Sequence, residues 1–228
     1  MKNVLFAAAA LVVAAGLAHA APTTYNDAEN DLFDNNFSNL DIKSVKVDND
    51  ASNVYISVET RGYQNWTKYM IYMNSSTASD FTGTNGWGRP VNLTTQISHY
   101  VGSWVDQDVP NTNQQNWAWD GFNWNMDGGQ TNNDQSQTGI NIVTFTISRS
   151  FLGLLSTGDV LLFDVATSGG GGGDPGVDHL SRSDMATPGW GTASTSGNFL
   201  AYTLHDIPAP GALALVGMGG LLAARRRR

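Results

Sequence analysis

The sequence predicts an all-β protein whose single domain, residues 21–206, is an antiparallel β-sandwich. Two observations carry this prediction. Short segments in which apolar and polar residues alternate recur along the chain, and a period of two is that of a half-buried strand. The segments between them are rich in Asn, Asp, Gly and Ser, whereas no long segment has helical periodicity. Strands at such intervals are typical of a sandwich.

The first half of the domain contains the clearest strand signals. Residues 21–40 are polar and acidic with a few apolar anchors, and we expect a lead-in with an edge strand or turn. Over residues 44–60, apolar and polar residues alternate on both sides of an Asn/Asp turn at 49–52, which predicts a β-hairpin. Residues 67–73 are apolar on both faces, which favours a central strand, and residues 97–105 are expected to form another.

The second half adds three strands and a short helical turn. Residues 140–148 alternate and predict a strand, and residues 150–155 follow it as one helical turn. Residues 159–167 are expected to form a buried strand, and residues 199–205 the closing strand.

Two short elements resemble carbohydrate-binding family 9 and DOMON-like domains. The hairpin from Val45 to Val58 is similar to their strand, Asn-Asp turn and strand, and residues 143–154 are similar to their Ile-Pro-x-x-x-Leu-Gly element, with Ser148 at the proline position. The resemblance implies a jelly-roll-type sandwich that binds carbohydrate. Some DOMON relatives hold haem between a Met and a His, which here would be taken from Met70, Met73, His99 and His179.

The two ends of the chain are expected to be processing signals rather than parts of the fold. Residues 1–20 combine a basic start, an apolar core and an A-x-A cleavage motif, as in a secretory signal peptide. Residues 207–228 combine a proline-rich break, an apolar run near the lower limit of a membrane span and four arginines. The positive-inside rule keeps those arginines cytoplasmic, so the domain before them faces outward. The alternative is a plain C-terminal tail anchor.

The C-terminal segment resembles the PEP-CTERM sorting signal of Gram-negative bacteria, which an exosortase reads and cleaves. That signal consists of a Pro-Glu-Pro box, an apolar helix and a basic cluster; here the box has alanine at its centre. The matching positions are Pro208, Pro210, Gly211, Arg225, Arg226, Arg227 and Arg228. The resemblance implies an exosortase-type partner, transient association with the inner membrane, and a location at the cell surface or outside the cell.

Charge and composition exclude several function classes. Without Lys2 and the four terminal arginines, seven basic residues face 20 acidic ones, a net charge of −13. Such an acidic domain is a poor partner for nucleic acid or an anionic membrane, but it is compatible with divalent cations and neutral glycans. The chain has no cysteine, which excludes disulfides, thiolate metal sites and thiol nucleophiles.

Tryptophans are concentrated in the middle of the domain, among Asn, Asp and Gly. Indole faces stack on sugar rings while Asn and Asp bind hydroxyls, so this mixture indicates a polysaccharide-binding surface. The candidate residues are Trp87, Trp117, Trp119, Asp120, Asn123 and Trp124. If residues 117–119 form a strand, both of its tryptophans lie on one face. The alternative is that the indoles are core residues, as we expect for Trp104 and Trp190.

Calcium is the cofactor for which the sequence offers ligands. Asp48 and Asp50 flank the hairpin turn, and Asp174 and Asp178 follow a run of glycines at 169–173. Carboxylates are ligands that Ca²⁺ prefers. The alternatives are an Asx turn that satisfies its own backbone in the first case and a mobile surface loop in the second.

Catalytic signals are weak. Asp106, Asp108, Asp120 and Asp127 lie near the tryptophans, but their spacing selects no acid/base pair of the kind that a glycosidase needs. The sequence shows no nucleophile elbow, H-E-x-x-H motif or phosphate loop. We therefore expect a non-catalytic exported protein that associates with polysaccharide; the alternatives are a structural surface protein without a specific ligand, and a haem or calcium carrier.

Overall fold

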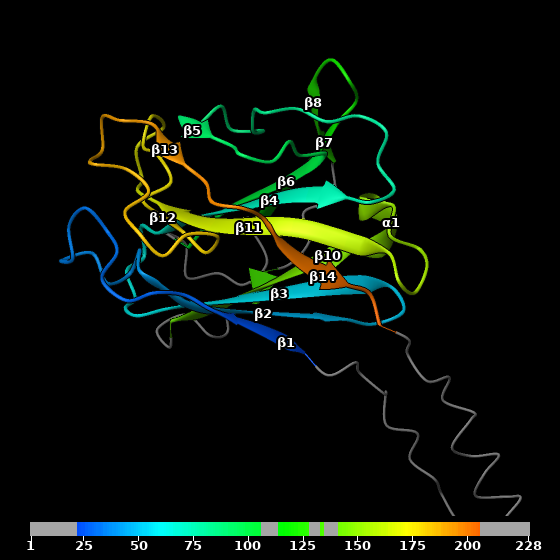
Figure 1. Ribbon diagram of the computed structural model, residues 1–228, viewed down its shortest axis with the longest axis horizontal. Coiled ribbons are helices and arrows are strands. Elements are labelled where there is room, and N and C mark those ends of the chain that lie inside the picture. The colour runs from blue at the N-terminus through cyan, green and yellow to red at the C-terminus, as the bar shows by residue number, and fades with distance from the viewer. Residues whose placement is uncertain (1–21, 106–113, 128–132, 135–140, 206–228) are drawn as a thin grey trace, which may run out of the picture. The chain divides into compact units, whose positions relative to one another are not determined.

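Two β-sheets stacked face to face form the protein, as the computed structural model shows for residues 22–105, 114–127, 133–134 and 141–205 (Figure 1). All of these described residues belong to one compact unit. Every strand pair within the two sheets is antiparallel. The predicted all-β sandwich is confirmed. The predicted signal peptide and sorting signal lie outside the described residues.

The first sheet has five strands in the order β1-β2-β3-β10-β9. Their bounds are Thr23–Asn26 for β1, Ile42–Asn49 for β2, Asn53–Thr60 for β3, Ile142–Ser148 for β10 and Asn133–Asp134 for β9. The predicted hairpin is β2–β3, and the Asp50 N–H closes its turn by donating to the Asn53 carbonyl at 3.0 Å. The alternation in these strands places every second side chain inward.

The second sheet has the order β12-β11-β4-β6-β7-β8, and β14 also pairs with β11. The bounds are Asp178–His179 for β12, Val160–Ser168 for β11, Lys68–Ser75 for β4, His99–Trp104 for β6, Gln114–Trp119 for β7, Trp124–Asp127 for β8 and Leu200–Thr203 for β14. Two short strands, β5 (Val91–Asn92) and β13 (Ser194–Thr195), pair in parallel above this sheet (Figure 1).

The predicted helical turn is α1, Arg149–Leu152, and Gly153 ends it in a left-handed conformation with φ 70°. Within the described residues, no helix is long and apolar enough to cross a membrane.

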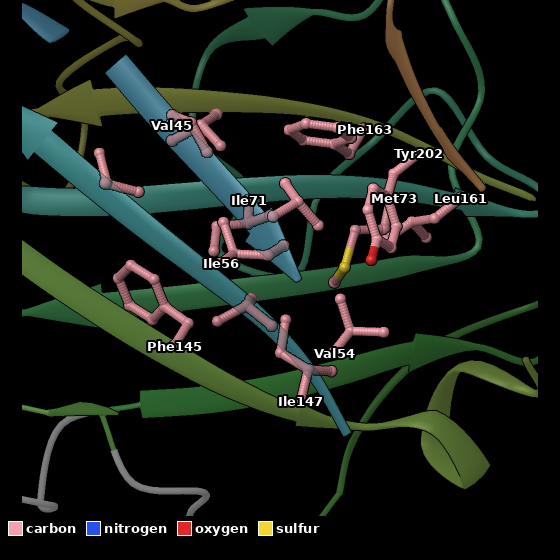
Figure 2. Close-up of a cluster of buried hydrophobic side chains, with 14 of the residues drawn as sticks. Val45, Val54, Ile56, Ile71, Met73, Phe145, Ile147, Leu161, Phe163 and Tyr202 are labelled. Atoms are coloured by element: carbon pink, nitrogen blue, oxygen red, sulfur yellow. The ribbon is translucent and has the colours of Figure 1, made fainter. Parts of the chain in front are cut away.

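The main core fills the space between the two sheets (Figure 2). Val45, Ile56 and Phe145 of the five-stranded sheet face Ile71 and Phe163 of the other, and all five side chains are fully buried. Burying a side chain of this size stabilises a fold by roughly 1.5–3 kcal/mol, so this layer provides the main driving force for folding.

The closing strand β14 is fastened at its end by one amide side chain. Asn49 Oδ1 accepts hydrogen bonds from the Tyr202 hydroxyl at 2.7 Å and from the His205 N–H at 3.0 Å. Asn49 Nδ2 donates to the His205 carbonyl at 3.4 Å. The last described residues of the chain are therefore tied to the end of β2.

The outer face of the seven-stranded sheet carries a second apolar cluster, which the sequence analysis did not predict. Met70 and Tyr72 of β4 point away from the main core, yet both are fully buried. The segments that contain β5 and β13 cover them, with Val91, Leu93 and Phe199 packed in this cluster. As predicted, β4 is apolar on both faces; the reason is a third layer made of loops.

Candidate functional site

The tryptophans gather on the outer face of the seven-stranded sheet, where β6, β7 and β8 lie side by side. We call this surface the tryptophan face; it consists of Trp87, Tyr100, Trp104, Trp117, Trp119 and Trp124. Strand periodicity places Tyr100 and Trp104 of β6 on the same side of the sheet. Trp117 lies opposite Tyr100 in register, and Trp119 lies opposite Trp124. As expected for a strand, Trp117 and Trp119 share one face.

Trp87 comes from the connection between β4 and β5 and lies directly against Gly102 of β6. A β-carbon at position 102 would come within 2.2 Å of the Trp87 ring. The Trp87 Nε1–H donates to Gln115 Oε1 at 2.8 Å. A glycine inside a strand often marks such a close approach, so Gly102 is a sequence signal for this contact that was not predicted.

Trp87 and Trp104 line an open pocket of about 360 Å³. The other lining residues are Lys68, Arg89 and Gly172. The two indole centroids are 6.0 Å apart and the ring planes are inclined by 43°. The Arg89 guanidinium lies 5.5 Å from the Trp87 centroid, and Lys68 Nζ lies 6.0 Å from that of Trp104. Both cations are in range of a cation–π interaction, which stabilises the orientation of the rings. Trp104, expected in the core, therefore lines this pocket instead.

Arg89 also holds the glycine-rich loop that forms the opposite wall. Its side chain is only 8% exposed, and Nη1 donates to Ser168 Oγ at 3.1 Å and to the Asp174 carbonyl at 3.2 Å. Further bonds run from Nη1 to the carbonyls of Gly169 and Gly171. Asp174 Oδ2 in turn accepts the Gly171 N–H at 2.8 Å. The loop is thus tied to the pocket by one guanidinium and by its own carboxylate.

The β7–β8 hairpin carries the remaining candidate residues. Asp120 Oδ1 accepts the N–H groups of Phe122 and Asn123 at 2.9 and 2.7 Å, and Oδ2 accepts from Asn125 Nδ2 at 2.7 Å. These hydrogen bonds lower the pKa of Asp120. Asp120 and Asn123 therefore build the turn, and at its tip the Phe122 side chain is 86% exposed. The sequence analysis did not single out Phe122.

The three hairpin tryptophans are all partly exposed. Trp119 and Trp124 have centroids 5.7 Å apart and planes inclined by 59°. Trp117 packs across Gly86, where a β-carbon would come within 2.6 Å of its ring. Trp117 and Trp124 both pack against the second apolar cluster, so each indole has one side in packing and part of its surface exposed.

The four predicted calcium ligands do not form one group. Asp50 Oδ1 accepts the N–H groups of Ser52 and Asn53, both at 2.7 Å, and Oδ2 accepts the Tyr55 hydroxyl at 2.6 Å. Asp48 Oδ1 accepts the Asn49 N–H at 2.8 Å. These are the bonds of an Asx turn.

Asp174 binds within the glycine-rich loop, where it accepts the Gly171 N–H. Asp178 lies beside Asp27 and Asp31, which were not predicted as ligands. Within the described part of the chain, Asp27, Asp31 and Asp178 form the only group of at least three possible metal ligands with oxygens within 4.8 Å of one another.

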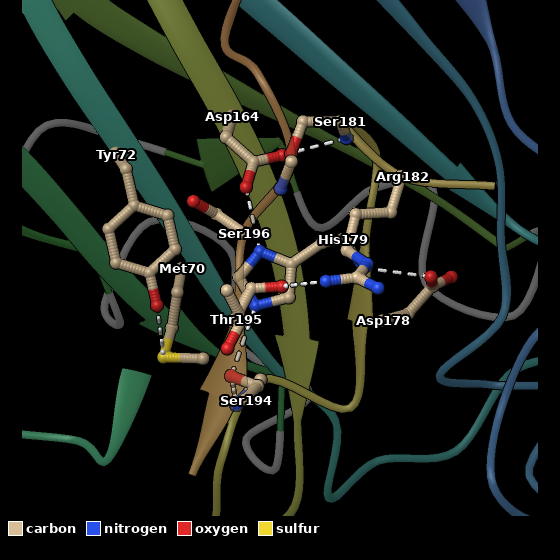
Figure 3. Close-up of polar contacts among 12 residues, drawn as sticks. Met70, Tyr72, Asp164, Asp178, His179, Ser181, Arg182, Ser194, Thr195 and Ser196 are labelled. Carbon is tan, nitrogen blue, oxygen red and sulfur yellow. Dashed lines mark hydrogen bonds and ion pairs between the residues drawn. The ribbon is translucent and has the colours of Figure 1, made fainter. Parts of the chain in front are cut away.

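Ser194, His179 and Asp164 form a buried hydrogen-bond chain (Figure 3). His179 Nδ1 lies 2.7 Å from Asp164 Oδ2, and Nε2 lies 3.2 Å from Ser194 Oγ, which is the order found in a catalytic triad. All three residues have zero exposure, and Ser194 Oγ already accepts the Gly176 N–H at 3.1 Å. In this arrangement Ser194 Oγ is closed to a substrate, and the chain fastens β12 and β13 to β11.

The groups considered for haem binding lie on strands of one sheet, and those considered for glycoside hydrolysis lie on other segments. Met73 and His99 are register partners on the core side of β4 and β6, whereas Met70 accepts a hydrogen bond from the Tyr72 hydroxyl at 3.3 Å. Burial lowers the pKa of His99 to about 4. Asp127 ends β8, and Asp106 and Asp108 lie outside the described residues.

Comparison with known proteins gives no match to this chain among protein-family models, curated proteins or solved structures.

Proposed function

We propose that this protein is an exported, non-catalytic surface protein that associates with polysaccharide through the tryptophan face. The observation that carries the proposal is the pocket between Trp87 and Trp104, two inclined and partly exposed indoles with a cation beside each ring. Small-molecule sites are concave, largely apolar and provided with a few polar groups, and the pocket volume of about 360 Å³ lies in their usual range.

The chemistry of the pocket suits a pyranose. An indole presents an apolar face to the C–H groups of a sugar ring. Trp87 is held in place by Gln115 and Gly102 before any ligand arrives, so little ordering entropy is lost on binding. The exposed Phe122 and the pair Trp119–Trp124 extend the aromatic surface along the β7–β8 hairpin.

The opposite face of the sandwich has a different lining among the described residues. Its pocket of about 220 Å³ is lined by side chains of β2, β3 and β10, namely Ser44, Lys46, Ser57, Glu59, Ile142 and Thr144. Among the described residues, no aromatic side chain lines that pocket. This contrast supports the tryptophan face as the glycan-binding side.

The proposal includes export and sorting. Residues 1–20 would direct the chain through the inner membrane, and residues 207–228 would hold it there until an exosortase acts. The domain would then work at the cell surface or in the extracellular polysaccharide, where an acidic, cysteine-free sandwich depends on its packed core for stability.

The test is affinity gel electrophoresis of the purified protein in gels that contain neutral or acidic polysaccharides. We expect retardation by at least one polysaccharide, and loss of that retardation in Trp87→Ala and Trp104→Ala. The matched control is Trp66→Ala, because Trp66 is also partly buried but packs against Phe37 in a different cluster. Circular dichroism checks that each variant is folded. Absence of retardation by any polysaccharide would favour a structural surface protein without a specific ligand. Equal retardation of wild type and Trp104→Ala would overturn the pocket as the binding site.

A further inference from the structure

Three carboxylates from distant parts of the chain converge beside the β1–β2 connection. Asp27 follows β1, Asp31 lies four residues later in the connection to β2, and Asp178 begins β12. One oxygen from each lies within 4.8 Å of the others. Two oxygens that each bind one Ca²⁺ at about 2.4 Å are separated by at most about 4.8 Å, so these three are close enough to share an ion.

Three oxygens of the group are buried and have no hydrogen-bond partner among the residues that the structure describes. Asp27 Oδ2 and both carboxylate oxygens of Asp31 expose less than 1 Å² each, and no other residue of the described chain donates a hydrogen bond to them. Asp178 is 3% exposed; its Oδ2 accepts the Ile42 N–H at 2.6 Å and its Oδ1 the His179 N–H at 2.8 Å. Buried polar atoms are normally paired, so the unpaired oxygens point to a ligand.

The charge of the group is not balanced by its surroundings. Arg61 is the basic residue whose charge acts on Asp31, but its Nε binds Asp41 Oδ1 at 2.9 Å and its Nη2 donates to the Ala28 carbonyl at 3.1 Å. Arg61 thus already pairs with Asp41, and its Nη1 also lies 3.9 Å from Glu29 Oε2. A divalent cation would supply the positive charge that this guanidinium does not give to the three carboxyls.

The three carboxyls also perturb one another. Burial and the neighbouring carboxylates raise the pKa of Asp27 to about 8, and burial also raises the pKa values of Asp31 and Asp178. A bound cation would relieve the repulsion between the groups and supply contacts to the buried oxygens of Asp27 and Asp31.

We propose that Asp27, Asp31 and Asp178 bind one calcium ion. The donors are all carboxylate oxygens, which are hard ligands that suit Ca²⁺, and the irregular origin of the three from a loop and a strand suits its flexible coordination. The ion would connect residue 31 to residue 178, and through Asp178 to the start of β2 at Ile42. The chain has no cysteine, so no disulfide can link the lead-in segment to the sandwich, and the bound ion would form such a link instead. The proposal is independent of glycan binding.

The test uses the full mature protein, stripped with EDTA and returned to calcium-free buffer. Isothermal titration with CaCl₂ should saturate at one ion per chain, and the Tm should rise by about 5 °C or more when the site is filled, because only the folded chain holds the three ligands together. Asp31→Asn should weaken calcium binding by at least about 10-fold. It should also lower the Tm in calcium but leave it equal or higher in EDTA, because the variant removes one of the repelling charges.

The matched control is Glu29→Gln, since Glu29 lies two residues from both Asp27 and Asp31 but has a 65% exposed side chain outside the group. It should change the calcium affinity by less than about threefold. Asp27→Asn provides a second ligand variant if Asp31→Asn does not fold. No saturable binding at about 10 mM CaCl₂, or equal loss in Glu29→Gln and Asp31→Asn, would overturn the site. Equal stabilisation by MgCl₂ and CaCl₂ would overturn its assignment to calcium.

Discussion

Trp87 and Gly102 form a contact that no other residue at position 102 can preserve. The Trp87 ring occupies the space where a β-carbon of residue 102 would stand, at 2.2 Å. Because Gly102 has no side chain, β6 leaves room for the Trp87 ring. The position of Trp87 therefore depends on a residue that is not among those lining the pocket.

Gly102→Ala should therefore displace Trp87 and open the pocket. We expect a loss of about 1–3 kcal/mol in the free energy of unfolding, as for other overpacked sites, together with weaker retardation by polysaccharide. Urea unfolding and affinity electrophoresis measure the two effects. Gly83→Ala is the control, because a β-carbon there meets no heavy atom within 4 Å. Unchanged tryptophan fluorescence and retardation in Gly102→Ala would show that the contact is not needed.

Arg89→Lys should loosen the glycine-rich loop. A lysine ammonium cannot reproduce the planar guanidinium that reaches the carbonyls of Gly169, Gly171 and Asp174. We expect a loss of about 2 kcal/mol or more in unfolding free energy and faster proteolysis within residues 169–174. The control is Arg182→Lys, whose arginine donates to the Thr195 carbonyl and to Asp184 at a more exposed position and should cost less than about 1 kcal/mol. Similar costs for the two variants would argue against a special role of Arg89.

His99 should make the protein less stable at acidic pH. Its folded pKa of about 4 lies below the ordinary value of 6.5, so between these values the unfolded chain binds a proton that the folded protein does not. Stability therefore falls as the pH decreases from about 6.5 to 4, by up to about 3 kcal/mol.

Replacement by glutamine isolates this effect from that of the carboxylates. The difference in unfolding free energy between wild type and His99→Gln, measured in urea at several pH values, should change within that window. His205→Gln is the control because His205 is exposed. A pH-independent difference for His99→Gln would contradict the assignment.

The proposal that residues 207–228 are a sorting signal predicts a defined product. In a host that carries an exosortase, the mass of the protein recovered from the medium should place its new C-terminus between Pro208 and Gly211. Substitution of Arg225 to Arg228 by glutamine should abolish processing, because the basic cluster that stops transfer is removed. An intact tail that remains in the membrane fraction would instead support a plain tail anchor.

The strands could be predicted from the sequence because their signal is local. Val45, Ile56 and Phe145 sit in segments with a period of two, and the structure places all three between the sheets. The loop layer over β4 could not be predicted in the same way. The apolar outer face of Met70 and Tyr72 shows that something covers them, but not which segment does so.

The sites depend on contacts between residues far apart in sequence, and this limited their prediction. Trp117 and Trp119 could be assigned to one face from strand geometry alone. Trp104 could not be assigned to a pocket, because Arg89 and Gly172, which line the same pocket, are distant from it in the sequence. Asp27 and Asp31 are separated from Asp178 by roughly 150 residues, and no local pattern connects them.

The attachment of β14 has a mechanical consequence. Tension on the chain beyond residue 205 would enter the fold through β14, at the end where Asn49 binds both Tyr202 and His205. The Asn49 bonds would meet that load before the ladder between β14 and β11 does. Asn49→Ala should therefore lower the force at which single-molecule pulling from the C-terminus detaches β14. A protein held at the cell surface by its C-terminal end would thus depend, under flow, on one buried amide.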